Sequence, residues 1–118
     1  MAKKTFVSSI SAVCDNATSF LLQYKAIPAN ALVCYDRIVA MNATSASSFV
    51  EVGLRHSDKD YILEKQANVA AKTSVEVDNK IFAPGHYKPY CKVFGGSAGD
   101  LICLYIFGYY VDDTTTES

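Results

Sequence analysis

The chain has 118 residues, half of them hydrophobic, with a formal net charge of −1 and a pI of about 6.0. This hydrophobic content excludes wholesale disorder, and the balanced charge argues against a nucleic-acid partner bound through a basic surface. No apolar run approaches the ~20 residues of a membrane-spanning helix, and the opening Met-Ala-Lys-Lys-Thr-Phe is not typical of a signal peptide. We therefore expect a single domain over residues 1–118, with no membrane partner and no secretion by signal peptide.

The first half of the chain has the pattern of short β-strands separated by turns. Val50, Val52 and Leu54 alternate with Glu51 and Arg55, which predicts a strand with one buried and one wet face. Earlier strands are predicted over 5–13, 18–27 and 32–41, ended by Asp15-Asn16, by the turn at 28–31 and by a small polar loop at 42–48.

The second half continues the pattern with shorter strands. After a turn at 57–60 we expect strands over 61–63, 74–77, 81–83 and 87–94, and a hairpin turn at 95–100. The alanine-rich segment 64–72 predicts one short helical turn or an irregular crossing. Pro89 within 87–94 favours an edge position for that strand. Asp112 to Ser118 forms a polar tail.

The last predicted strand, Leu101 to Val111, is apolar on both faces. Two packed antiparallel sheets normally leave one face of each strand wet, so this strand is expected to be covered by a second layer or by a neighbouring subunit. The sequence thus predicts an all-β protein, an antiparallel jelly-roll-like β-sandwich of about eight strands. The residues predicted to form a subunit or layer contact are Tyr105, Phe107, Tyr109 and Tyr110.

No grouping of residues predicts catalysis, a cofactor or a metal site. Four cysteines are present without a Cys-x-x-Cys pair, and we expect them to be reduced and mostly buried. His56 with Asp58 and Asp60 is interpreted as a solvated turn, and His86 as a loop residue. A cupin-like enzyme would need a cluster of histidines, and the chain has only two, 30 positions apart. We therefore predict a protein that is not an enzyme.

Tyrosines in the second half suggest a possible binding surface. Tyr suits positions with one end buried and the other wet, and Tyr87 and Tyr90 are the surface-binding candidates. With polar loops such as 58–60 they would make a glycan platform, so a small carbohydrate-binding module is the alternative function.

The segments "FVEVGLRH", "YILEKQ" and "PGHYKPYCKVFGGSAGDLICLYIFGYYV", about half of the chain, resemble small β-sandwich proteins of phage virions. These are the capsid decoration and cement proteins; the last segment is also similar to trimeric jelly rolls of the tumour-necrosis-factor type. The resemblance implies a non-enzymatic structural protein of a virion, assembled in the host cytoplasm. Its implied partners are itself, as a homotrimer, and a larger capsid shell. Short polar arms, "AKKT" and "DDTTTES", would reach neighbouring subunits.

Overall fold

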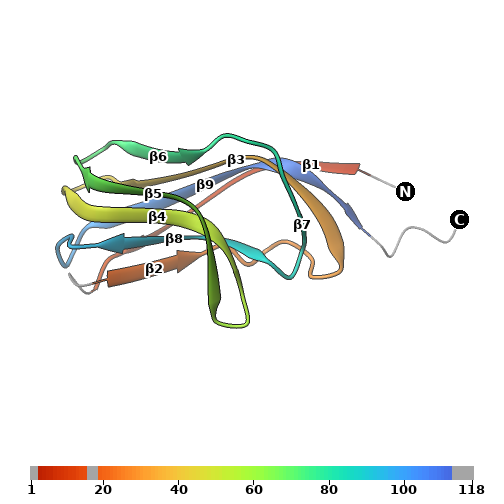
Figure 1. The fold of residues 1–118 in the computed structure, drawn as a ribbon, viewed down its shortest axis with the longest axis horizontal. Helices are drawn as coiled ribbons and strands as arrows, with labels where there is room; N and C mark the ends of the chain where they lie inside the picture. Colours follow the sequence, from red (N-terminus) through yellow and green to blue (C-terminus); the bar gives the residue numbers. More distant parts are fainter. Residues whose placement is uncertain (1–2, 16–18, 113–118) are drawn as a thin grey trace, which may run out of the picture.

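A computed structural model describes residues 3–15 and 19–112, and their regular structure consists of nine β-strands (Figure 1). Sheet A has the order β1-β9-β3-β6, with β7 also paired to β3, and sheet B has the order β2-β8-β4-β5. Every pairing is antiparallel, which confirms the predicted all-β antiparallel sandwich. The strands are β1 (Lys3–Val13), β2 (Ser19–Gln23), β3 (Ala31–Asn42), β4 (Ser47–His56), β5 (Lys59–Val69), β6 (Ser74–Val77), β7 (Ile81–Pro84), β8 (Lys88–Phe94) and β9 (Leu101–Asp112).

Strands β6 and β7 act as two halves of one edge strand. Both pair with β3, β7 along Leu32 to Tyr35 and β6 along Ile38 to Met41. The break between them coincides with a bulge in the β3–β9 pairing between Tyr35 and Arg37. With β6 and β7 counted together, each sheet has four strands, and their order is that of a jelly roll.

The core lies between the two sheets and is built by alternation along each strand. In β9, Ile102, Leu104 and Ile106 point inward and are fully buried. The Tyr35 side chain is also fully buried, and its hydroxyl donates to the Tyr87 carbonyl oxygen at 3.4 Å. Other fully buried members of this core are Val33, Ile38, Val50, Val52, Val75, Cys91 and Val93. Burial of these apolar side chains is the main force that holds the two sheets together.

Two predictions about individual strands are wrong. Residues 64–72 contain no helical turn, because β5 continues to Val69 in antiparallel pairing with β4. Strand β8 is not an edge strand, since it lies between β2 and β4. Pro89 is tolerated because it is the second residue of β8, where the ladder begins and its missing N–H is least needed.

The structure describes most of the predicted N-terminal arm, but only the first residue of the predicted C-terminal arm. Lys3, Lys4 and Thr5 belong to β1 and pair with β9, so this part of "AKKT" is not an arm. The C-terminal segment lies outside the described residues after Asp112.

Candidate functional site

The outer face of sheet A carries exposed apolar side chains from four of its strands, β1, β3, β7 and β9. Val7 on β1 is 72% exposed, and it lies opposite Phe107 on β9. Phe82 on β7 is 64% exposed and pairs with Cys34 of β3. We call this surface the apolar face, and its members are Val7, Val13, Leu32, Phe82 and Leu101, which are exposed, with Tyr105, Phe107 and Tyr109, which are half-buried.

Cationic side chains and thiols of the same sheet contact parts of the apolar face. The ammonium of Lys3 lies 4.2 Å from the centre of the Tyr109 ring, and the Arg37 guanidinium lies 5.9 Å from that of Phe107. Hydrogen bonding with the Cys103 thiol raises the pKa of Tyr105, and the Cys34 thiol does the same for Tyr109. Within residues 3–15 and 19–112, both sheets are already used in the sandwich, so the predicted covering layer is absent from this part of the chain.

Three of the four predicted contact residues share the apolar face, and the fourth does not. Tyr105, Phe107 and Tyr109 alternate along β9 on its outer side. Tyr110 points to the core side, where its ring centre is 6.1 Å from that of Phe6. The four residues therefore do not form one surface.

The outer face of sheet B carries polar pairs beside the exposed side chains of Phe49 and Ile62. The Tyr90 hydroxyl donates to Glu51 Oε2 at 2.5 Å, and both side chains are buried. Asp60 accepts from Arg55 Nε at 2.7 Å and from the Lys92 ammonium. Buried polar groups need such partners, because an unpaired group loses its hydration without compensation.

The prediction that Tyr90 is an exposed binding residue is wrong, since its side chain has no exposed surface. Tyr90 pairs across the sheet with Gly53, a residue with no side chain to compete for the same place. A Cβ at Gly53 would lie 2.1 Å from the Tyr61 carbonyl oxygen, so only glycine fits at this bulge. Tyr90 therefore seals the sheet surface and is not available to a ligand.

The pKa values on sheet B follow from burial and pairing. Burial raises the pKa of the Tyr90 hydroxyl, and the Glu51 carboxylate that accepts its hydrogen bond raises it further. For Asp60, burial acts to raise the pKa, but hydrogen bonds from Lys92 and Arg55 outweigh it and hold the pKa below its usual value. The Asp60 carboxyl group therefore stays ionised and the Tyr90 hydroxyl stays neutral. Fixed charge states of this kind suit a structural role.

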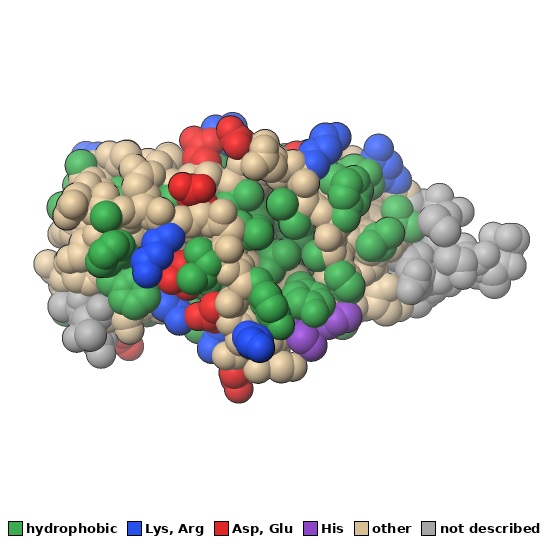
Figure 2. Space-filling view, viewed as in Figure 1, with side chains coloured by type: hydrophobic (Ala, Val, Ile, Leu, Met, Phe, Trp, Pro, Cys, Tyr) green, Lys and Arg blue, Asp and Glu red, His purple; other side chains and the backbone are tan. Residues whose placement is uncertain are grey.

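Tyr87 belongs to a cluster of rings at the end of the molecule that carries the β4–β5 turn. Its ring centre lies 4.8 Å from that of His56, 4.9 Å from His86 and 5.6 Å from Tyr61. Figure 2 shows the two histidines side by side at the surface, next to a patch of hydrophobic side chains. Because Tyr90 is buried, the predicted pair of surface tyrosines is reduced to Tyr87.

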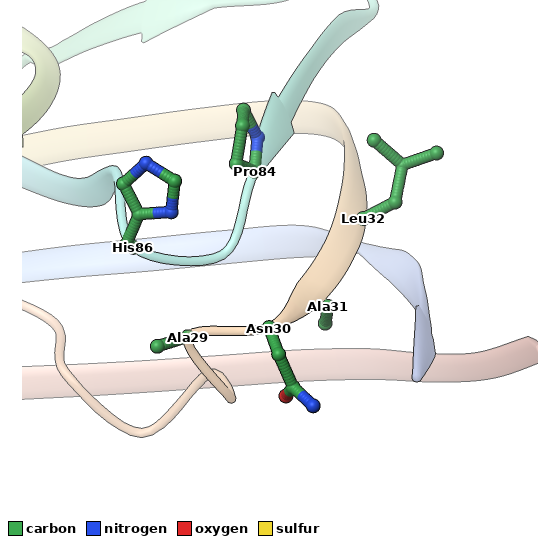
Figure 3. Close-up of a pocket in the computed structure, with 6 residues that line it drawn as sticks. All are labelled: Ala29, Asn30, Ala31, Leu32, Pro84 and His86. Carbon is green, nitrogen blue, oxygen red and sulfur yellow. The ribbon is translucent and has the colours of Figure 1, made fainter. Parts of the chain in front are cut away.

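A shallow hollow adjoins this cluster between the loop before β3 and the β7–β8 turn (Figure 3). It is lined by Ala29, Asn30, Ala31, Leu32, Pro84 and His86. A small-molecule site normally has several polar groups directed at one point in a largely apolar cleft. Asn30 and His86 are the polar side chains here, and in Figure 3 they point in different directions. The hollow therefore lacks the arrangement of a small-molecule site.

The opposite end of the sandwich contains a buried polar cluster that is structural. Asn42 Nδ2 donates to Asp100 Oδ2 at 2.9 Å and to Ser47 Oγ at 3.2 Å. Its Oδ1 accepts from the backbone amides of Thr44 and Ser45, both at 3.0 Å. The hydrogen bond from Asn42, together with those from the Ser97 amide and Ser45, holds the pKa of Asp100 below its usual value. These bonds fasten the β3–β4 turn to the β8–β9 turn.

The four cysteines lie in the interior as small side chains. None of them is in a disulfide and all are buried, as expected for small apolar side chains. Burial raises the pKa of the Cys91 thiol to about 12, so it is not a reactive thiolate. In the described ranges no three His, Cys, Asp or Glu side chains gather as metal ligands. No helix in the same ranges is long and apolar enough to cross a membrane.

Comparison with known proteins gives no family. No family model matches the sequence, and no curated protein does. Among solved structures, infectious bursal disease virus of the Gx strain is 16% identical with a TM-score of 0.29, and the match covers 96% of this chain and 33% of the viral one. The Gt strain is 12% identical with a TM-score of 0.31, covering 92% and 31%.

A VP2 subviral particle of the same virus is 14% identical with a TM-score of 0.24, covering 90% and 32%. The chain thus spans about a third of the length of the structures it matches. All three belong to one virus, so the likeness is to virus particle proteins and is not specific to phages. At these scores it is a coarse likeness, and it establishes no common family.

Proposed function

We propose that this chain is a non-enzymatic structural protein that associates with copies of itself through the apolar face and forms part of a larger particle, such as a virus shell. The observation that carries the proposal is the apolar face itself. Five of the eight exposed large hydrophobic side chains lie on it, around the three half-buried rings of β9. A jelly roll is an architecture that capsid proteins share with lectins and cupins, so the fold permits this role without requiring it.

The chemistry of the apolar face matches the interior of a protein interface. Such interfaces are rich in aromatic residues and arginine and poor in other charged groups at their centre. Here Tyr105 and Phe107 lie on the inner strand β9 with Arg37 opposite Phe107 on β3, while Lys3 and Glu76 lie on the edge strands β1 and β6. An exposed apolar sheet face is also the kind of patch that a monomeric protein rarely leaves open to water.

The finer form of the proposal is a homotrimer that decorates or cements a capsid in the virion. A trimer places three copies of one face around an axis, and each contact would bury about 800 Å² per partner if it is of standard size. The apolar face extends along strands of 11 and 12 residues, β1 and β9, which is long enough for such a contact.

The experiment is a light-scattering measurement of solution mass at increasing concentration, with two matched variants. Val7→Asp places a charge on the apolar face, and Ile62→Asp, a residue 50% exposed on sheet B, is the control. We expect the wild-type protein and the control to approach a multiple of the 12.9 kDa chain mass, three for a trimer, while Val7→Asp stays monomeric. A wild-type protein that remains monomeric at every concentration would overturn self-association through this face.

A further inference from the structure

The fold brings together the only two histidines of the chain. His56 is the last residue of β4, and His86 lies in the turn between β7 and β8, 30 positions later. Their ring centres are 4.6 Å apart with an angle of 63° between the ring planes. Neither residue is deeply buried, so both rings are open to solvent ions.

Each histidine is held by a tight, sterically restricted turn. Ser57 and Asp58, with φ of 53° and 62°, form the two-residue connection that fixes His56. On the other side, the Gly85 amide donates to the Ala31 carbonyl oxygen at 2.7 Å. A Cβ at Gly85 would lie 1.9 Å from the Pro28 carbonyl oxygen, so the β7–β8 turn is pressed against the preceding loop. The backbone positions of both histidines are therefore fixed before any ligand arrives.

The imidazole nitrogens are largely uncommitted. His56 Nε2 lies 3.3 Å from Ser57 Oγ, and the structure assigns His86 no hydrogen bond to the described residues. In the tautomer whose Nε2–H donates to Ser57, Nδ1 of His56 keeps its lone pair for a ligand. A hydrogen bond of this kind on the second nitrogen is how proteins orient histidines that bind metals.

We propose that His56 and His86 chelate one divalent transition-metal ion, with water in the remaining positions. A metal about 2.1 Å from each ligating nitrogen lies about 3.2 Å from each ring centre. The ring centres are 4.6 Å apart, which is close enough for one ion to bind a nitrogen from each ring. Two imidazole ligands with water in the other positions suit Cu²⁺ or Ni²⁺ better than Zn²⁺, whose structural sites normally have four protein ligands.

The charges around the pair are compatible with a bound cation. Arg55 and Lys92 share the Asp60 carboxylate, which lies 2.7 Å from Arg55 Nε, and the Lys88 ammonium donates to the Ile27 carbonyl oxygen. The Asp58 carboxylate is 96% exposed at the tip of the same turn, 3.9 Å from Arg55. Lys59, paired with His56 across the hairpin, is the remaining nearby cation. Because the site has two protein ligands, its occupancy leaves coordination positions open to solvent.

The test uses Ni²⁺ as the probe, titrated calorimetrically into the full chain and into His56→Ala, His86→Ala and Asp58→Asn. We expect one Ni²⁺ per wild-type chain, at least a tenfold weaker affinity in each histidine variant, and little change in Asp58→Asn. Loss of either histidine leaves the ion a single protein ligand. The Asp58→Asn variant tests instead whether the ion binds to the carboxylate at the tip of the β4–β5 turn. Circular dichroism verifies that each variant is folded.

A second readout identifies the ligands. Electron paramagnetic resonance of bound Cu²⁺ should show two nitrogen ligands in the wild-type protein and one in either histidine variant. Wild-type Ni²⁺ affinity in both histidine variants, or a single nitrogen ligand in the wild-type spectrum, would overturn the proposal. The result can be distinguished from self-association through the apolar face, because nitrogen coordination of the metal and the solution mass of the protein are measured separately.

Discussion

The two sheets differ in how their outward-facing side chains are partnered. On sheet B, a buried tyrosine, Tyr90, is joined to Glu51, and Asp60 is held by Lys92 and Arg55. On sheet A, the rings of β9 and the exposed Val7 and Phe82 have no covering layer among the described residues. The polar side chains of sheet B find their partners within the chain, whereas most of the exposed large apolar side chains lie on sheet A. The difference shows that β-alternation alone does not determine whether an outward position is part of the stable core.

The largest expected effect comes from removing Tyr90. Tyr90→Ala should lower the free energy of unfolding by about 4 kcal/mol, because it empties a fully buried site and leaves Glu51 without its donor. The equivalent change on the other sheet, Tyr105→Ala, should cost about 1 kcal/mol since that ring is only half-buried. Urea unfolding followed by circular dichroism measures both. Equal losses would show that the two faces do not differ in this way.

A smaller change isolates the hydrogen bond. Tyr90→Phe keeps the ring and should destabilise the protein by about 2 kcal/mol, because the buried Glu51 carboxylate loses the Tyr90 hydroxyl. Its matched control is Tyr109→Phe on the apolar face, with an expected change below about 0.5 kcal/mol. The same unfolding experiment separates them. A neutral Tyr90→Phe would mean that Glu51 finds another partner.

The Asp60 pair should make stability depend on pH. Since the pKa of Asp60 is lowered in the folded protein, its contribution is present above the usual aspartate pKa and is lost as pH falls through the lowered folded value. Asp60→Asn should cost about 1 kcal/mol at neutral pH, because the partners are partly exposed to solvent. The difference from wild type should shrink as the pH is lowered in urea titrations. A difference that stays constant with pH would assign the loss to packing.

The smallest expected effect on stability is on the apolar face. Val7→Thr keeps a β-branched side chain on β1 and should change the free energy of unfolding by less than about 0.5 kcal/mol. It should nevertheless weaken self-association, since it removes exposed apolar surface from the proposed contact. Sedimentation velocity over a range of concentrations measures this. A clear loss of stability without a change in association would mean that Val7 serves the fold of the single chain.

Local alternation predicted most of the strands, because burial of one face leaves a period of two in the sequence. It also predicted the two-sided apolar character of β9. The prediction failed for β5, where alanines and exposed polar residues hide a strand that is held by pairing with β4.

The features at the two ends and on sheet B depend on contacts between distant residues. Tyr90 is buried because Gly53 and Glu51 on the neighbouring strand leave it space and a partner, and these residues are more than 35 positions away. The pairing of His56 with His86 likewise arises only when β4 and the β7–β8 turn meet. Neither feature has a local signal in the sequence.

The antiparallel pairing of β1 with β9 has a consequence for how this unit is combined with other sequences. Lys3 lies opposite Val111, so the chain enters and leaves the described fold at the same end (Figure 1). A unit with adjacent ends can be inserted into a surface loop of another protein without stretching its host. The same geometry should permit circular permutation, with a short linker between the present ends and a new opening at the exposed Ser57-Asp58 turn.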